Sequence, residues 1–253
     1  MPEHIIDISE ESGVRYLNFG SDSIQGAMRI ARPWSLELEY TREMMAGLLL
    51  RPHPDWPRSC LMVGLGAASQ LRFLHRHFPD CRITALEINP AVISICQQFF
   101  KLPPESPQLG IIAEDASTWI RRAPKAHYDL ILLDGFAADG CPAALDSPGF
   151  YLACRAVMSE QGVLACNLLS RSRGFQARVR RIRQAFERRC LILPPSDSGN
   201  AIALSATGTA IDTDLATMQQ RAKLLHEQTG LDLRPALNRL RLSRSLPADH
   251  LTL

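Results

Sequence analysis

The chain has 253 residues, of which 46% are hydrophobic, and its formal net charge is +2. This length and composition predict one substantial core with a small appendage, and so balanced a charge identifies no partner by itself. No apolar run approaches the roughly 20 residues of a membrane-spanning helix, and the acidic N-terminus lacks the pattern of a signal peptide. We therefore expect a cytoplasmic protein with no membrane partner.

The first predicted element is a β-hairpin in an N-terminal extension, residues 1–33. Val14 to Phe19 alternates like a strand, residues 20–23 are typical of a turn, and Ile24 to Ile30 returns as a second strand. A single hairpin is marginally stable, so we expect it to lean on the rest of the chain. The spacing of apolar residues then predicts a helix over 35–50.

Residues 34–206 alternate apolar strand-like runs with helical patterns. This alternation predicts an α/β domain with a doubly wound, mostly parallel sheet and helices on both faces. A strand pair around residues 190–204 is expected at its end, with a reversed last strand. Residues 207–253 are expected to form a helical appendage, with a helix over 213–229 and then a loose polar tail.

The most specific motif is a glycine-rich turn between two strand-like runs. The run Leu61-Met62-Val63 ends in Gly64-Leu65-Gly66-Ala67-Ala68, and a later run ends in Glu87, 21 positions after Gly66. Glycines allow a sharp turn and close approach to a ligand, and an acid at this spacing can accept hydrogen bonds from ribose hydroxyls. The motif predicts a nucleoside ligand, although Ala68 weakens the dinucleotide form of the fingerprint.

Two further acids end apolar runs, Asp115 and Asp134. Ligands of open α/β sheets lie outside the carboxyl ends of the strands, so Gly64, Glu87, Asp115 and Asp134 should converge on one cleft. For each acid alone, a turn or a helix cap is an equal alternative.

The seven cysteines include no C-x-x-C pair, and most of them lie in apolar segments. This is typical of reduced, buried cysteines and not of disulfides or zinc ligands. The histidines are scattered, and His75 and His77 lack carboxylate or cysteine partners nearby. We expect no metal site.

Several of these segments carry a family resemblance. They are Phe19-Gly20 with Ile24-Gln25, Glu39-Tyr40 with Glu43-Met44, Val63 to Ala68, Ala85 to Pro90, Glu114-Asp115-Ala116, Tyr128 to Asp134 and Gly162 to Asn167. In them the chain resembles the spermidine synthase family (polyamine aminopropyltransferases) and its methyltransferase-like relatives, from about Arg15 to about Asn167. The resemblance implies the Rossmann-like class I methyltransferase fold and, as donor substrate, S-adenosylmethionine or its decarboxylated form.

The resemblance also implies roles for individual residues. Glu87 would hold the ribose hydroxyls, Asp115 with Ala116 the adenine edge, and Ile88 would lie against the base. Asp134 would take the proton from the attacking amine. Gln25 of the predicted hairpin and Tyr40 of the predicted helix over 35–50 would close over the site. The implied donor-binding residues are Gly64, Gly66, Glu87, Ile88, Asp115, Ala116 and Gln25, and the implied substrate or gate residues are Tyr40 and Asp139.

The chain departs from the family at two acids. Spermidine synthases carry an Asp inside the glycine-rich loop, where this chain has Ala67, and another three residues after Asp134, where it has Ala137. Asp139 lies two positions further on. Because a cationic diamine needs carboxylates in place of its hydration, these losses argue against ordinary transfer to putrescine.

Two surface segments have alternative interpretations. Residues 135–149, with three glycines and two prolines, are predicted to form a gate over the cleft, the alternative being an ordinary connection. The arginines of residues 171–189 could form a nucleic-acid surface, but an apolar stripe among them favours a solvent-exposed helix, so nucleic-acid binding is not expected.

Together these features predict a transferase that moves an aminopropyl or methyl group from a sulfonium donor to an unidentified small-molecule acceptor, in a chain that could form a homodimer. A catalytically silent nucleoside-binding regulator is the alternative. An NAD-dependent oxidoreductase is the weakest, because the third glycine is missing.

Overall fold

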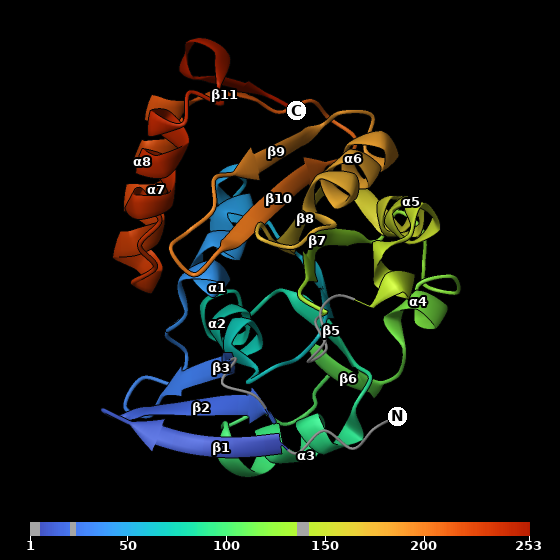
Figure 1. Cartoon of the computed structure of the whole chain (residues 1–253), viewed down its shortest axis with the longest axis vertical. Helices are drawn as coiled ribbons and strands as arrows, with labels where there is room; N and C mark the ends of the chain where they lie inside the picture. Colours follow the sequence, from blue (N-terminus) through green and yellow to red (C-terminus); the bar gives the residue numbers. More distant parts are fainter. Residues whose placement is uncertain (1–5, 21–23, 136–141) are drawn as a thin grey trace.

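The computed structural model describes residues 6–20, 24–135 and 142–253 (Figure 1). The central strands are β4 (Ser59–Val63), β5 (Arg82–Glu87), β6 (Leu109–Ala113), β7 (Tyr128–Leu133), β8 (Met158–Leu169), β9 (Cys190–Leu193) and β10 (Asn200–Ala206). They form a seven-stranded sheet in the order β6-β5-β4-β7-β8-β10-β9. Strand β10 runs antiparallel to both of its neighbours. The other neighbouring strands, in the order β6-β5-β4-β7-β8, pair in parallel. The predicted doubly wound sheet with a reversed strand is confirmed.

Helices cover both faces of this sheet, because successive strand residues point to opposite sides. On β7, Leu130 and Leu132 belong to one core and Ile131 and Leu133 to the other. The first core is covered by α1 (Glu39–Met44), a 3-10 helix η1 (Met45–Leu49), α2 (Ser69–His77), α3 (Pro90–Phe99), α7 (Leu215–Thr229) and α8 (Arg234–Leu242). The second is covered by α4 (Ala116–Trp119), α5 (Pro148–Val157) and α6 (Phe175–Ala185). Among the described residues, no helix is both long and apolar enough to cross a membrane.

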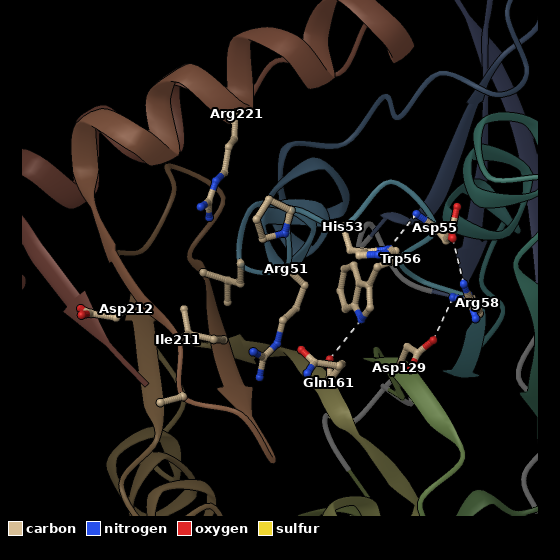
Figure 2. A pocket seen from close by; sticks show the side chains of 13 residues that line it. Arg51, His53, Asp55, Trp56, Arg58, Asp129, Gln161, Ile211, Asp212 and Arg221 are labelled. Carbon is tan, nitrogen blue, oxygen red and sulfur yellow. Dashed lines mark hydrogen bonds and ion pairs between the residues drawn. The ribbon is translucent and has the colours of Figure 1, made fainter.

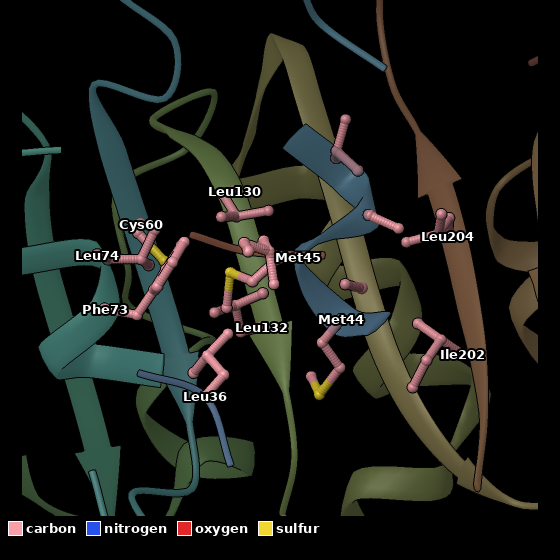
Figure 3. Close-up of a cluster of buried hydrophobic side chains, with 14 of the residues drawn as sticks. Leu36, Met44, Met45, Cys60, Phe73, Leu74, Leu130, Leu132, Ile202 and Leu204 are labelled. Carbon is pink, nitrogen blue, oxygen red and sulfur yellow. The ribbon is translucent and has the colours of Figure 1, made fainter. Parts of the chain in front are cut away.

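The helix predicted over 35–50 is shorter and ends in the tighter helix η1. Figure 3 shows Met45 of η1 pointing toward Leu130 and Leu132 of β7. A Cβ atom at Gly47 would lie 3.1 Å from Val163 Cγ1, so the backbone of η1 packs directly on β8. This close packing holds α1, which carries Tyr40, against the sheet.

The N-terminal segment forms a three-stranded antiparallel sheet of β1 (Ile6–Glu11), β2 (Val14–Phe19) and β3 (Ile24–Arg29). The predicted hairpin of β2 and β3 is confirmed. Strand β1 was not predicted, because its side chains are mostly exposed and polar and its order comes from backbone pairing with β2. The division of the chain into three domains stays a prediction.

The C-terminal region differs from the prediction after α7, which is confirmed. The expected loose tail is wrong: α8 buries Leu237 and Leu240, and β12 (His250–Thr252) pairs with β11 (Asp212–Asp214). Arg239 of α8 forms ion pairs with Glu39 and Glu43 of α1. This amphipathic helix was not predicted, because the arginines made the segment resemble a polar tail.

The cysteines of the described residues are all buried and free, as predicted from their apolar surroundings; Cys141 lies outside these residues. The thiol of Cys96 donates a hydrogen bond to the carbonyl of Gly66 at 3.0 Å. One of these small apolar side chains therefore supports the glycine-rich turn.

The arginine-rich helix α6 has an internal role as well as an exposed face. Arg178 and Arg181 both pair with Asp146, the last residue of the 3-10 helix η2 (Ala143–Asp146). Val179 and Ile182 are buried against the sheet. The predicted apolar stripe is therefore confirmed, and the ion pairs anchor the end of the segment predicted as a gate. Ala137 and Asp139 lie outside the described residues.

Candidate active site

The predicted site residues gather at one edge of the central sheet. Gly64 follows β4, Glu87 ends β5, Asp115 follows β6 and Asp134 follows β7, and these strands are neighbours in the order β6-β5-β4-β7. From β4 the chain moves outward to β5 and β6, and then returns to β7 on the other side. The carboxyl ends of β4 and β7 therefore flank a topological switch point, where open α/β sheets bind ligands.

Glu87 shapes the glycine-rich turn from the neighbouring strand. Its carboxylate accepts hydrogen bonds from the backbone N–H groups of Leu65 and Asn89, each at 3.0 Å, and the residue is only 9% exposed. Burial raises the pKa of Glu87, and the backbone donors lower it in part. The sequence did not predict this structural role, which adds to the predicted contact with ribose.

The glycine-rich turn touches both β3 and the end of β7. Gly64 has φ +91°, and a Cβ atom there would lie 2.3 Å from the carbonyl oxygen of Asp134. Gly66 has φ +50°, and a Cβ atom there would lie 3.0 Å from the carbonyl oxygen of Gln25. Only glycine allows such approaches at these angles. The turn thus brings Gly64, Gly66, Gln25 and Asp134 together.

A buried arginine that was not predicted supports this turn from behind. Arg72 on α2 donates hydrogen bonds to the carbonyl groups of Pro33, Ala67 and Phe100. Burial lowers the pKa of Arg72 to about 10. Because three backbone segments meet at one guanidinium, Arg72 ties the turn to α3 and to the segment before α1. Its neighbours one turn away on α2 are Ser69, His75 and Arg76, so the pattern of apolar residues gave no signal for it.

The residues predicted to hold the adenine lie beyond Glu87. Ile88 directly follows it and is 55% exposed, which leaves its side chain accessible to a ligand. Asp115 caps α4 by accepting a hydrogen bond from the N–H of Ser117 at 2.8 Å, and Ala116 is buried. Asp115 is therefore a helix cap, which was the alternative interpretation of this acid. The contacts of Ile88, Asp115 and Ala116 with adenine stay predictions.

Asp134 is held by hydrogen-bond donors from two elements. The Asn167 amide on β8 donates to Oδ1 at 2.8 Å, and a hydrogen bond joins the Tyr40 hydroxyl on α1 to the same carboxylate. Burial raises the pKa of Asp134, while these two donors lower it in part. Burial and the nearby negative charge raise the pKa of Tyr40 well above 10, so Tyr40 stays protonated. A partly buried carboxylate held in this way can accept a proton from an amine.

A separate cavity of about 640 Å³ lies at the opposite edge of the sheet, beside the amino ends of β4 and β7 (Figure 2). Several of its polar groups pair with one another. Arg58 binds Asp55 and, through its N–H, Asp129, while the indole of Trp56 donates to the carbonyl of Gln161. Of the predicted site residues that the structure describes, none lines this cavity.

Comparison with known proteins identifies the family of the chain. The model of the spermine/spermidine synthase domain matches residues 38–187. A polyamine aminopropyltransferase of Chromobacterium violaceum is 33% identical over 251 residues, 99% of this chain and 94% of that protein. Human methyltransferase-like protein 13, solved with SAH, superimposes with a TM-score of 0.69 at 23% identity over 76% of this chain and 93% of that one.

A spermidine synthase solved with the transition-state analogue AdoDATO superimposes with a TM-score of 0.65 over 97% of this chain and 86% of that chain. Its sequence identity is 17%, so this likeness bears on the fold alone. The family model covers more than half of the chain, and the C. violaceum relative matches nearly all of it. The chain belongs to the spermine/spermidine synthase family of transferases.

Proposed function

We propose that the protein transfers an aminopropyl group from decarboxylated S-adenosylmethionine to an amine of the polyamine class. The observation that carries this proposal is the contact between the glycine-rich turn and Asp134 at the switch point of the sheet. A nucleoside held by the turn and Glu87 has its sulfonium end near the carboxylate that can receive a proton. The names of the full-length relatives support the same reaction.

In the proposed reaction, the acceptor nitrogen attacks the carbon beside the sulfonium sulfur. A carbon–nitrogen bond forms, the carbon–sulfur bond breaks, and methylthioadenosine leaves with the electron pair. The proton released by the amine passes to Asp134. The protein contributes orientation of the two substrates, a carboxylate that favours the neutral amine in the transition state, and exclusion of water from the sulfonium.

The donor tail would meet no carboxylate at Ala67, where spermidine synthases carry an Asp. Ala67 is buried against β3, and a Cβ atom at Gly26 would lie 2.5 Å from the Ala67 Cβ. The backbone of β3 therefore occupies the space beside this position. A free aminopropyl ammonium gains no ion pair there, and the amino acid carboxylate of S-adenosylmethionine meets no like charge.

We therefore expect no strong preference for decarboxylated S-adenosylmethionine over S-adenosylmethionine. Calorimetric titration of both donors under one set of conditions should give affinities within about 100-fold, or roughly 2.7 kcal/mol. A larger preference for the decarboxylated donor would mean that another group replaces the missing acid.

Glu87→Ala should weaken binding of methylthioadenosine by about 1.5–3 kcal/mol, the range for hydrogen bonds to a charged group. The expected loss has two parts, since the carboxylate would bind ribose and also holds the N–H of Leu65. Calorimetry measures the affinity, and Glu105→Ala, on an exposed carboxylate, is the control. Unchanged affinity in a folded Glu87→Ala variant would contradict the assignment.

The proposed reaction itself is tested by incubating the protein with each donor and a series of di- and triamines. Mass spectrometry should detect an aminopropylated amine together with methylthioadenosine. Detection of a methylated acceptor together with S-adenosylhomocysteine would mean that the protein transfers methyl groups and not aminopropyl groups. Donor binding without any product would favour the catalytically silent regulator. The cytoplasmic location and the homodimer stay predictions.

A further inference from the structure

A chain of polar side chains runs from Asp134 across the sheet to the surface. Asn200 on β10 donates from Nδ2 to Oδ1 of Asn167 at 2.9 Å, and Ser198 donates from its hydroxyl to Oδ1 of Asn200 at 2.8 Å. Asn167 is 4% exposed and Asn200 is 8% exposed, whereas Ser198 lies at the surface. The antiparallel register pairs Ile202 with Asn167, which makes Asn167 and Asn200 diagonal neighbours on one face.

While Asp134 is ionised, the hydrogen bonds of this chain run in one direction. An ionised Asp134 accepts and cannot donate, so Asn167 must present its NH2 group to it. The oxygen of Asn167 then faces Asn200, which must present its own NH2 group, and the remaining oxygen of Asn200 accepts from Ser198. Each side chain then has a partner, and the hydroxyl of Ser198 also lies 2.8 Å from the hydroxyl of Ser196, where either oxygen can donate.

We propose that Asn200 and Ser198 are positioning residues, which fix the amide of Asn167 with its NH2 group toward Asp134. The proposal rests on the proposed role of Asp134 as the proton acceptor. If the Asn167 amide rotated by half a turn, its NH2 group would meet the NH2 group of Asn200. Rotation of Asn167 alone removes two hydrogen bonds between buried groups. They are restored only if Asn200 rotates as well and donates to the hydroxyl of Ser198, so the rotated state is disfavoured.

This restriction matters when Asp134 takes up a proton. A protonated Asp134 could donate to Asn167 only after the amide had rotated, and Asn200 opposes the rotation. The chain therefore favours the ionised carboxylate and offsets part of the effect of burial on its pKa. Of the described residues, Tyr40 on α1 is the titratable group in contact with Asp134. The turn after β4 contacts Asp134 through its backbone, and β8 contacts it through the amide of Asn167.

The test replaces Asn200 by Leu, which has a similar size and no hydrogen-bonding group. We expect the pKa of Asp134 to rise by about one unit, a tenfold change in proton affinity, because the rotated amide becomes available to the protonated acid. The titration is followed by carbon NMR of the Asp134 carboxyl group, assigned with Asp134→Asn. The acidic limb of kcat/KM should move upward by the same amount. Asn238→Leu, on an exposed asparagine of α8, is the control.

The two readouts separate this proposal from the proposed function. A shifted carboxyl titration with an unshifted rate profile supports the fixed amide and overturns the role of Asp134 in turnover. An unshifted titration in folded Asn200→Leu overturns the positioning role. If this variant does not fold, Ser198→Ala, at the surface, should give a smaller rise in the pKa of Asp134, and no rise overturns the proposal.

Discussion

Asp134→Asn should lower the rate of transfer by about 10²–10⁴, the usual contribution of a general base, while donor affinity changes by no more than a few fold. The substitution keeps the shape of the side chain and removes its negative charge. The amide oxygen can still accept from Asn167, so the surroundings of the turn are retained. Single-turnover kinetics with a fixed donor measures the rate, and calorimetry measures donor affinity.

Asp129→Asn is a matched control for this experiment, because Asp129 lies at the opposite end of the same strand β7 and binds the N–H of Arg58. It should leave both rate and donor affinity unchanged. Loss of nucleoside binding in Asp134→Asn would assign the residue to the donor pocket. If neither binding nor turnover changed, the silent-regulator alternative would gain.

The pH dependence of the reaction should carry the signature of the same residue. A base acts in its ionised form, so the rate falls as the pH drops through its pKa. Burial raises the pKa of Asp134, which moves this acidic limb above the value of about 3.9 that is usual for Asp. The limb should be absent from the residual activity of Asp134→Asn. A limb that stays in place in the variant would belong to another group.

Much of the central sheet could be predicted from the sequence, because its signals are local. The apolar runs that became β4, β5 and β7 end in glycine or an acid, and parallel connections bring those ends to one edge. Asn89 caps α3, and Pro90 lies in its first turn, an arrangement typical of an Asn-Pro pair at a helix start. Periodicity and turn chemistry are enough to identify such features.

The parts that escaped prediction depend on contacts between distant segments. The contact of Gly26 with Ala67 and the Asn200–Asn167 pair join residues far apart in the sequence. Strand β1 exists through its pairing with β2 and buries little of its own surface. A single sequence carries no signal for such partners, although an asparagine within the apolar second half of β8 indicates a polar role.

The helix α8 shows how such a distant contact can reach the reaction site. Arg239 meets Glu39 and Glu43 of α1, which are four residues apart and therefore lie on one face of that helix. Tyr40, on the same helix, bonds Asp134. Tyr40 is one of the two hydrogen-bond donors to Asp134. The ion pairs therefore hold α1, which carries Tyr40, against the C-terminal region.

Arg239→Ala should lower the free energy of unfolding by about 3 kcal/mol, because it leaves the Glu43 carboxylate, only 3% exposed, without its counter-charge. We take the lower end of the range for broken buried pairs, since the side chain of Arg239 is itself 26% exposed. Denaturant unfolding measures the loss. Arg241→Ala, on an exposed arginine of the same helix, should cost less than about 0.5 kcal/mol.

Two further variants separate charge from packing in this cluster. Adding Glu43→Gln to Arg239→Ala removes the uncompensated charge and should recover part of the lost stability. If Arg239→Ala destabilised the protein no more than Arg241→Ala, the ion pairs would contribute nothing, and α8 would be held by Leu237 and Leu240 alone. If stability fell while the rate of transfer at saturating donor stayed unchanged, α1 would keep Tyr40 in place without the ion pairs to Arg239. We expect the rate to fall as well, because Tyr40 lies between the two glutamates in the sequence of one short helix, so a shift of that helix moves its hydroxyl relative to Asp134.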